Sequence, residues 1–127
     1  MSKYYEAYIY RGKLYLKMKH LREALKDFDR AIALDPHKQI AFVGKGDCLR
    51  LMENYEEARR FYSEAYKHSP NTNGSLLLRR AICSMELRHY DSALEDITRL
   101  LEGDPENSEA LYFKGLMLNK TSTLSSM

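Results

Sequence analysis

Residues 21–36 read LREALKDFDRAIALDP. Apolar side chains recur in this stretch at intervals of three and four residues, which is the spacing of one face of an α-helix. The Asp35-Pro36 pair predicts the end of that helix, because proline lacks a backbone N–H and constrains the residue before it. Residues 55–70 read YEEARRFYSEAYKHSP, and residues 90–105 read YDSALEDITRLLEGDP. An alanine, a bulky residue four positions later and a closing proline therefore occur together three times.

The segments before these stretches repeat with the same period. Gly12 recurs as Gly46, 34 residues later, and the third stretch begins 35 residues after the second. Gly115 lies 69 residues after Gly46, which equals one step of 34 and one of 35. We place the additional residue in the loop at residues 71–74, where an insertion costs little. A period of this length with helical spacing in both halves indicates a stack of two-helix units, and no alternating pattern predicts a strand.

The small residues have a packing reason. Gly12 and Ala24 are expected where the two helices of one unit cross most closely, since a larger side chain there would push the helices apart. Ala31 and Ala65 are expected where the second helix of a unit meets the following unit. A bulky residue such as Phe28 then fills the remaining space.

This pattern resembles the tetratricopeptide repeat family. The family pattern has a large residue, glycine and tyrosine or leucine in the first helix, then alanine, an aromatic residue, alanine and proline. The first two repeats supply Tyr8, Gly12, Tyr15, Ala24, Phe28, Ala31 and Pro36, and then Phe42, Gly46, Leu49, Ala58, Tyr62, Ala65 and Pro70. A weaker third repeat supplies Leu77, Ala81, Ser84, Ala93, Ile97, Leu100 and Pro105, and a fourth begins with Leu111, Gly115 and Leu118.

The resemblance implies an all-α fold, a right-handed superhelical solenoid of helix–turn–helix hairpins with three repeats and a C-terminal capping helix. We expect a single domain over residues 4–120, with repeats at about 5–38, 39–72 and 74–107 and the capping helix at 108–120. The small polar tail at residues 121–127 is expected to be disordered. The unusually apolar last helix leaves two alternatives open, an imperfect cap or a stack that continues in a longer protein.

Composition narrows the class of protein. The chain has 127 residues with 30% charged side chains and a net charge of +2, which by itself does not favour nucleic-acid binding. No apolar run approaches the ~20 residues that span a bilayer, and the N-terminus has no apolar segment of the signal-peptide type. A cytoplasmic protein without a membrane segment is therefore expected.

Residues that carry catalytic or metal chemistry do not form a pattern. The four histidines, His20, His37, His68 and His89, lack metal-ligand spacing and are expected to be solvated. Cys48 and Cys83 are expected to be free and buried, because neighbouring helices lie too far apart for a disulfide. We therefore expect no enzyme activity, no metal and no cofactor.

In the family, the first helices of successive repeats line a concave surface, and that resemblance implies a groove for a peptide segment or a partner's helix. By the repeat alignment, the groove residues are Ile9, Tyr10, Lys13, Val43, Asp47, Arg50, Leu78, Arg79, Ile82, Tyr112, Phe113 and Leu116. The expected function is that of a scaffold or adaptor, as a module of a larger assembly or multidomain protein. Self-association through the terminal helices stays open.

Two alternative functions are weighed against this one. Co-chaperone members of the family hold the acidic C-termini of heat-shock chaperones with a clamp of two lysines, two asparagines and one arginine. The matching positions here are Ile9, Lys13, Gly44, Ser75 and Arg79. Only Arg79 keeps the expected identity, so the sequence disfavours the clamp, although Lys13 could partly substitute. RNA binding by related helical repeats is disfavoured too, because the corresponding faces carry apolar residues.

Overall fold

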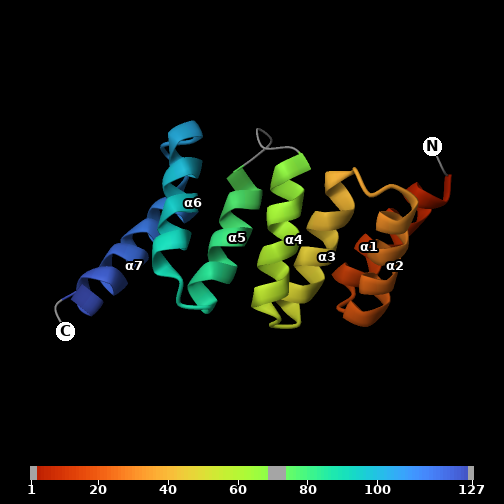
Figure 1. Cartoon of the computed structure of the whole chain (residues 1–127), viewed down its shortest axis with the longest axis horizontal. Helices are drawn as coiled ribbons and strands as arrows, with labels where there is room; N and C mark the ends of the chain where they lie inside the picture. Colours follow the sequence, from red (N-terminus) through yellow and green to blue (C-terminus); the bar gives the residue numbers. More distant parts are fainter. Residues whose placement is uncertain (1–2, 69–73, 126–127) are drawn as a thin grey trace. The chain divides into compact units, whose positions relative to one another are not determined.

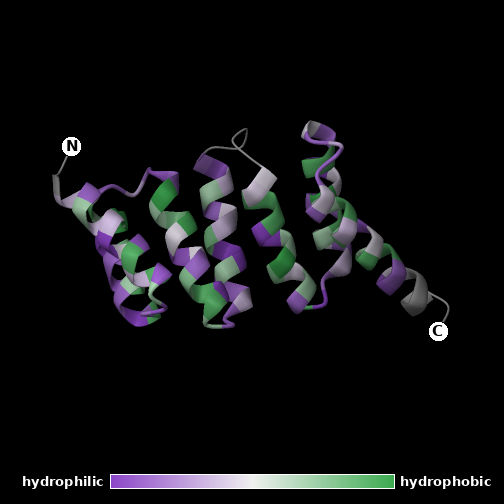
Figure 2. Cartoon of the chain, turned by 180° about the vertical axis from the view of Figure 1, so that it is seen from behind, coloured by the Kyte–Doolittle hydropathy of each residue, from purple (hydrophilic) through white to green (hydrophobic). Residues whose placement is uncertain are grey.

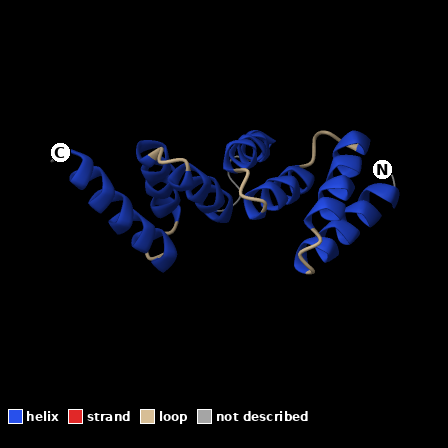
Figure 3. Ribbon diagram, turned by 90° about the horizontal axis from the view of Figure 1, so that it is seen from below, coloured by secondary structure: helices blue, strands red, loops and turns tan. Residues whose placement is uncertain are grey.

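The computed structural model describes residues 3–68 and 74–125, and every regular element in these ranges is an α-helix (Figures 1 and 3). The prediction of an all-α fold is confirmed. The helices are α1 (Lys3–Lys17), α2 (Leu21–Leu34), α3 (Gln39–Leu51), α4 (Tyr55–His68), α5 (Gly74–Glu86), α6 (Tyr90–Gly103) and α7 (Ser108–Ser125). As the sequence predicted, α2 and α6 end directly before Asp35-Pro36 and Asp104-Pro105.

The chain divides into two compact units, residues 1–70 and 71–127. In the first unit, α1 packs on α2, α2 on α3 and α3 on α4. In the second unit, α5 packs on α6 and α6 on α7. The division falls where the repeat spacing lengthens to 35 residues. The additional residue was predicted in a loop at residues 71–74. Residues 71–73 lie outside the described residues, and Gly74 begins α5.

The predicted end of the last helix is wrong. We expected α7 to stop at residue 120, but it continues to Ser125. No glycine or proline follows Lys120 to stop the helix, and the Thr121 hydroxyl donates hydrogen bonds to the Met117 and Leu118 carbonyl oxygens. Residues 121–125 are therefore helical, and residues 126–127 lie outside the described residues.

The three turns within the hairpins share one backbone geometry. Each contains a non-glycine residue with positive φ, and these residues are Lys19 (64°), Glu53 (63°) and Arg88 (64°). The following residue donates its N–H to a carbonyl five positions earlier, as His20 does to Tyr15 at 2.8 Å. Glycine and asparagine are the residues that usually adopt this conformation, so Lys19, Glu53 and Arg88 did not predict it.

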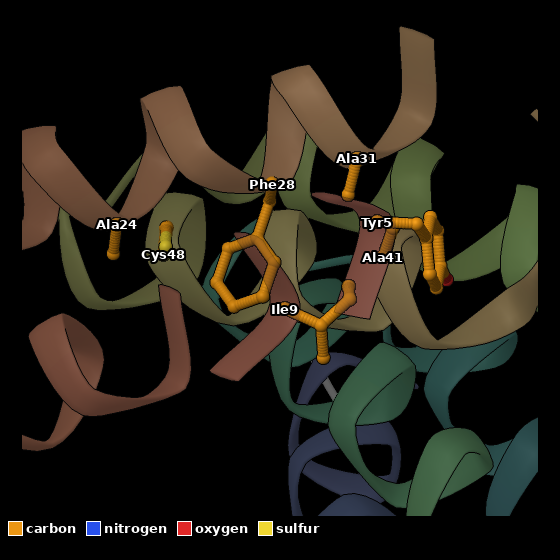
Figure 4. Packing of buried hydrophobic residues seen from close by; sticks show 7 residues of the cluster. All are labelled: Tyr5, Ile9, Ala24, Phe28, Ala31, Ala41 and Cys48. Atoms are coloured by element: carbon orange, nitrogen blue, oxygen red, sulfur yellow. The ribbon is translucent and has the colours of Figure 1, made fainter. Parts of the chain in front are cut away.

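The core of the first unit forms around Phe28 of α2, which is fully buried (Figure 4). A Cβ atom added to Gly12 of α1 would lie 3.0 Å from this ring, and one added to Gly44 of α3 would lie 2.4 Å from it. The ring therefore fills the space that two glycines on neighbouring helices leave. Ala31 and Ala41 pack in the same cluster, as expected for the contact between a second helix and the next repeat.

Polar and apolar residues alternate around each helix (Figure 2). Beside the core, ion pairs join the two helices of a hairpin. Arg11 of α1 donates two hydrogen bonds, of 2.7 and 2.8 Å, to the buried carboxylate of Asp27 on α2. Arg80 and Asp96 make the same pair between α5 and α6, at 2.9 and 2.7 Å. At the corresponding place in the second hairpin, the ammonium of Lys45 lies 4.3 Å from the centre of a phenylalanine ring and 2.6 Å from Asp29.

The Asp27 ion pair predicts acid sensitivity. Its hydrogen bonds from Arg11 hold the pKa of Asp27 below the usual 3.8 against the opposing effect of burial, and Arg30 lowers this pKa further. The pair therefore stabilises the fold above the ordinary carboxyl pKa, and that contribution is lost as the pH falls through the lowered value. At pH 7 we expect Asp27→Asn to lower the free energy of unfolding by about 1–3 kcal/mol.

Urea denaturation at several pH values tests this prediction. Below pH 4 the difference between the original chain and Asp27→Asn should shrink, and it should vanish below the lowered pKa of Asp27, where both chains lack the charged pair. Glu102→Gln, an exposed change on α6, serves as the control. A difference that does not depend on pH would show that the charge of Asp27 contributes nothing.

Candidate functional site

The first unit holds five of the predicted groove residues at exposed or half-buried positions on α1 and α3. Tyr10 and Lys13 lie about one turn apart on α1, and both are exposed, with Tyr10 at 70%. Val43, Asp47 and Arg50 lie on one face of α3, since their spacing of four and three residues places them one above another. These three side chains are half-buried, and α1 and α3 are in contact. We call these five residues the α1–α3 surface.

Ile9 does not belong to that surface, contrary to the prediction. Its side chain is 3% exposed and packs in the core cluster with Phe28 and Ala24 (Figure 4). The repeat alignment placed Ile9 on the concave face. Because α1 packs against both α2 and α3, that position is covered.

A hydrogen-bonded network fixes the α3 side of the surface. The buried Tyr62 hydroxyl donates to Asp47 Oδ1 at 2.5 Å and accepts a hydrogen bond of 3.0 Å from Arg50 Nε. Burial and the nearby Asp47 charge raise the pKa of Tyr62, so the hydroxyl stays protonated and donates. The network holds both charged side chains in one orientation. The signal in the sequence was the tyrosine that replaces Phe28 one repeat later, because only tyrosine brings a hydroxyl.

The second unit holds the other predicted groove residues. Leu78, Arg79 and Ile82 on α5 are half-buried. On α7, Tyr112 is 66% exposed and its ring meets that of Phe113 edge to face, with centroids 5.4 Å apart. Leu116 is half-buried one turn further along α7. Each unit therefore presents its own share of the predicted residues, and a groove shared by both units stays a prediction.

The positions of the carboxylate clamp are unsuited to it in the first unit. Ile9 is buried and apolar, so it offers no donor. At Gly44, any side chain would begin 2.4 Å from a Phe28 ring carbon, a distance that Cβ atoms do not adopt, so an asparagine has no room. Of the three clamp positions in this unit, only Lys13 presents a cation at the surface.

The residues that could carry metal or nucleophilic chemistry are dispersed. All four histidines are exposed, as predicted, and two of them, His37 and His68, lie edge to face with centroids 6.2 Å apart. Within the described ranges, no three residues of metal-binding type come together. Both cysteines are free and buried, as predicted. Burial, with the charges of Asp47 and Asp29, raises the pKa of Cys48 to about 12, so its thiol is not a nucleophile near neutral pH.

Family comparison matches residues 5–38 and residues 49–116 to the tetratricopeptide repeat, and the second match alone covers more than half of the chain. The chain belongs to the tetratricopeptide repeat family. The resemblance drawn from the glycine, alanine and proline spacing is thereby confirmed. No helix that the structure describes is both long and apolar enough to cross a bilayer.

Individual relatives give the same fold. The DnaJ homolog subfamily C member 7 homolog of Dictyostelium discoideum is 29% identical over 104 residues, which are 82% of this chain and 19% of that protein. The chain thus spans about a fifth of that curated relative. Among solved structures, the first TPR of Spaghetti (RPAP3) bound to HSP90 peptide SRMEEVD has a TM-score of 0.90 and 18% identity, with 96% of each chain covered. YrrB, described as a TPR protein with an unusual peptide-binding site, has a TM-score of 0.83 and 26% identity over 94% of this chain and 61% of YrrB.

Proposed function

We propose that this tetratricopeptide repeat chain is a protein-interaction module whose α1–α3 surface binds a peptide segment of a partner protein. The observation that carries the proposal is the exposed pair of Tyr10 and Lys13 on α1, together with the fixed charges of Asp47 and Arg50 on α3, the helix that α1 contacts. Tyrosine and arginine are the residues that most often dominate protein interfaces. Because the Tyr62 network already orients Asp47 and Arg50, little side-chain entropy is lost when a peptide binds.

The relatives support peptide binding in general. The Spaghetti structure holds an HSP90 peptide and YrrB carries a peptide-binding site, according to their descriptions. In this chain the filled space at Gly44 and the burial of Ile9 argue against recognition of a terminal carboxylate by the clamp. We therefore expect the ligand to be recognised along its length, by the tyrosine ring and the charges, rather than by its free C-terminus.

The proposal also includes the cellular compartment and the role of the module. We infer that the module acts in the cytoplasm as a scaffold within a larger assembly and does not catalyse a reaction. Association with a chaperone, through a segment other than a clamped carboxylate, is compatible with the similarity of the chain to the Hsp70-Hsp90 organizing protein 3 of Arabidopsis thaliana and to the Hsp70/Hsp90 co-chaperone CNS1 of Saccharomyces cerevisiae.

Peptides selected from a displayed library on the purified chain test the proposal. For a selected synthetic peptide, Tyr10→Ala and Lys13→Ala should each weaken the affinity measured by calorimetry about tenfold, because each removes a surface contact worth about 1.4 kcal/mol. Lys26→Ala, an exposed change on α2, is the matched control and should leave the affinity unchanged. Equal affinities for all three variants would refute the α1–α3 surface as the binding site.

The peptide SRMEEVD distinguishes the co-chaperone alternative. It should be compared in two forms, one with a free C-terminal carboxylate and one with a C-terminal amide. We expect both forms to bind with the same weak affinity. A strong preference for the free carboxylate that Arg79→Ala abolishes would favour the clamp instead.

A further inference from the structure

Helix α7 exposes a row of residues at positions that α3 and α5 bury. Leu111, Gly115 and Leu118 follow one another at intervals of four and three residues and so lie on one face of α7. Leu111 is 49% exposed and Leu118 is 48% exposed. A Cβ atom added to Gly115 would meet nothing within 4 Å. We call these three residues the α7 outer face.

The same three positions are covered in the hairpins. In α3 they are Phe42, Gly46 and Leu49, and all three are buried. A Cβ atom at Gly46 would lie 2.6 Å from the ring of Tyr62, which belongs to the covering helix α4. At Gly12 the ring of Phe28 from α2 takes the same place. A glycine at this position thus receives a bulky side chain from a second helix.

Lys114, which directly precedes Gly115, is a charged residue beside the α7 outer face. Lys114 stands at the repeat position of Arg11 and Arg80. Each of those two arginines binds an aspartate that directly precedes the bulky residue of the covering helix, as Arg11 binds Asp27 beside Phe28. No ion pair joins Lys114 to another residue within the part of the chain that the structure describes. The cation therefore lies beside the α7 outer face in the position that an aspartate of a covering helix would bind.

Residues 121–125 do not turn back over this face. In the hairpins the first helix ends five residues after the glycine or alanine, at Lys17, Leu51 and Glu86, and a turn follows. The equivalent end in α7 is Lys120, yet the helix continues to Ser125 without that turn (Figure 1). Within the described residues, no turn at this position brings a helix back over the face.

We propose that the α7 outer face binds one amphipathic helix of another protein. We expect that helix to carry the same residue pattern as the helices that cover the hairpins. The pattern has a small residue, then an aspartate three positions later and an aromatic residue directly after the aspartate. A second small residue follows three positions after the aromatic residue. This is the pattern of Ala24, Asp27, Phe28 and Ala31 in α2. The aromatic ring would lie over Gly115 and the aspartate would bind Lys114. The α7 outer face shares no residue with the α1–α3 surface, so variants of the two can be tested separately.

A labelled peptide with the sequence of residues 20–35, HLREALKDFDRAIALD, is a suitable probe because it carries the whole pattern. Fluorescence anisotropy with the full chain should show saturable binding. Gly115→Leu should weaken it at least tenfold, since the new side chain occupies the place of the ring. This variant should melt at the same or a higher temperature, because exposed helical glycine is replaced by a better helix former.

Charge reversal makes the test specific. Lys114→Glu should weaken the binding of the peptide, and a peptide whose aspartate at position 27 is replaced by lysine should bind Lys114→Glu better than it binds the original chain. Lys120→Glu, on another face of α7, is the control and should bind as the original chain does. Binding that is insensitive to both Gly115→Leu and Lys114→Glu would overturn the proposal.

The chain's own association is measured in parallel. Light scattering over a range of concentrations should show a monomer. A dimer that Gly115→Leu dissociates would show that a second copy occupies the face and would overturn the assignment to another protein. Neither result affects the α1–α3 surface, whose peptides are tested with Tyr10→Ala.

Discussion

Phe28→Ala is expected to lower the free energy of unfolding by about 3–5 kcal/mol, the usual cost of removing a buried phenylalanine ring. The ring is fully buried in the core cluster and lies against both Gly12 and Gly44, so its loss leaves a void between α1, α2 and α3. Neither glycine can fill the void because neither has a side chain. Urea denaturation followed by circular dichroism measures the effect.

The loss should be confined to the first unit. Hydrogen exchange of Phe28→Ala is expected to accelerate in α1, α2 and α3, while α5 and α6 keep the protection of the original chain. Tyr10→Ala removes an exposed ring from α1 and is the control, with an expected change within about 0.5 kcal/mol. A loss below about 1 kcal/mol for Phe28→Ala would contradict the packing described around Gly44.

Gly44→Asn is expected to destabilise the chain by about 1–3 kcal/mol, although asparagine is the type of residue that a carboxylate clamp uses. A side chain at this position begins 2.4–2.6 Å from three carbon atoms of the Phe28 ring. The ring has no free space into which to move, because it is itself fully buried. The measurement is the urea midpoint together with the affinity for the peptide SRMEEVD, which should not increase.

A second helical glycine provides the matched control. Gly115→Asn introduces the same side chain in α7, where nothing lies within 4 Å of the added Cβ. Asparagine has a higher helix propensity than glycine, so this variant should be neutral or slightly stabilising. Equal destabilisation by both substitutions would mean that asparagine in a helix, and not the contact with Phe28, is the cause. Increased affinity of Gly44→Asn for the free carboxylate form would show that the clamp can be built here.

The repeat pattern predicted the helices and the residues that pack between them. A period of 34 residues placed Gly12, Ala24 and Phe28 at one crossing of two helices, and the structure has them in contact there. The prediction of the crossing succeeds because small residues recur only where two helices come close. Each repeat has to meet this packing requirement within its own hairpin. Proline after aspartate likewise predicted where α2 and α6 end, since the effect of proline on its neighbours is local.

The surface was harder to predict than the core. Ile9 was assigned to the groove by its repeat position, but α3 and α2 together cover it. The connection of Asp47 and Arg50 through the Tyr62 hydroxyl depends on two helices being side by side, which a period does not describe. The positive φ of Lys19 and its equivalents was also missed, because a tightly packed hairpin imposes a conformation that these residue types seldom choose.

The sequence by itself determined the family, the helical hairpins and the small residues at their crossings, because each of these follows from local spacing repeated along the chain. Tertiary structure alone decided which side chains remain accessible. It buried Ile9, filled the clamp position at Gly44 with Phe28 and left Gly115 uncovered on a helix that does not turn back. The physical reason is that exposure depends on which helix lies over a residue, and identical positions in successive repeats are covered by different neighbours.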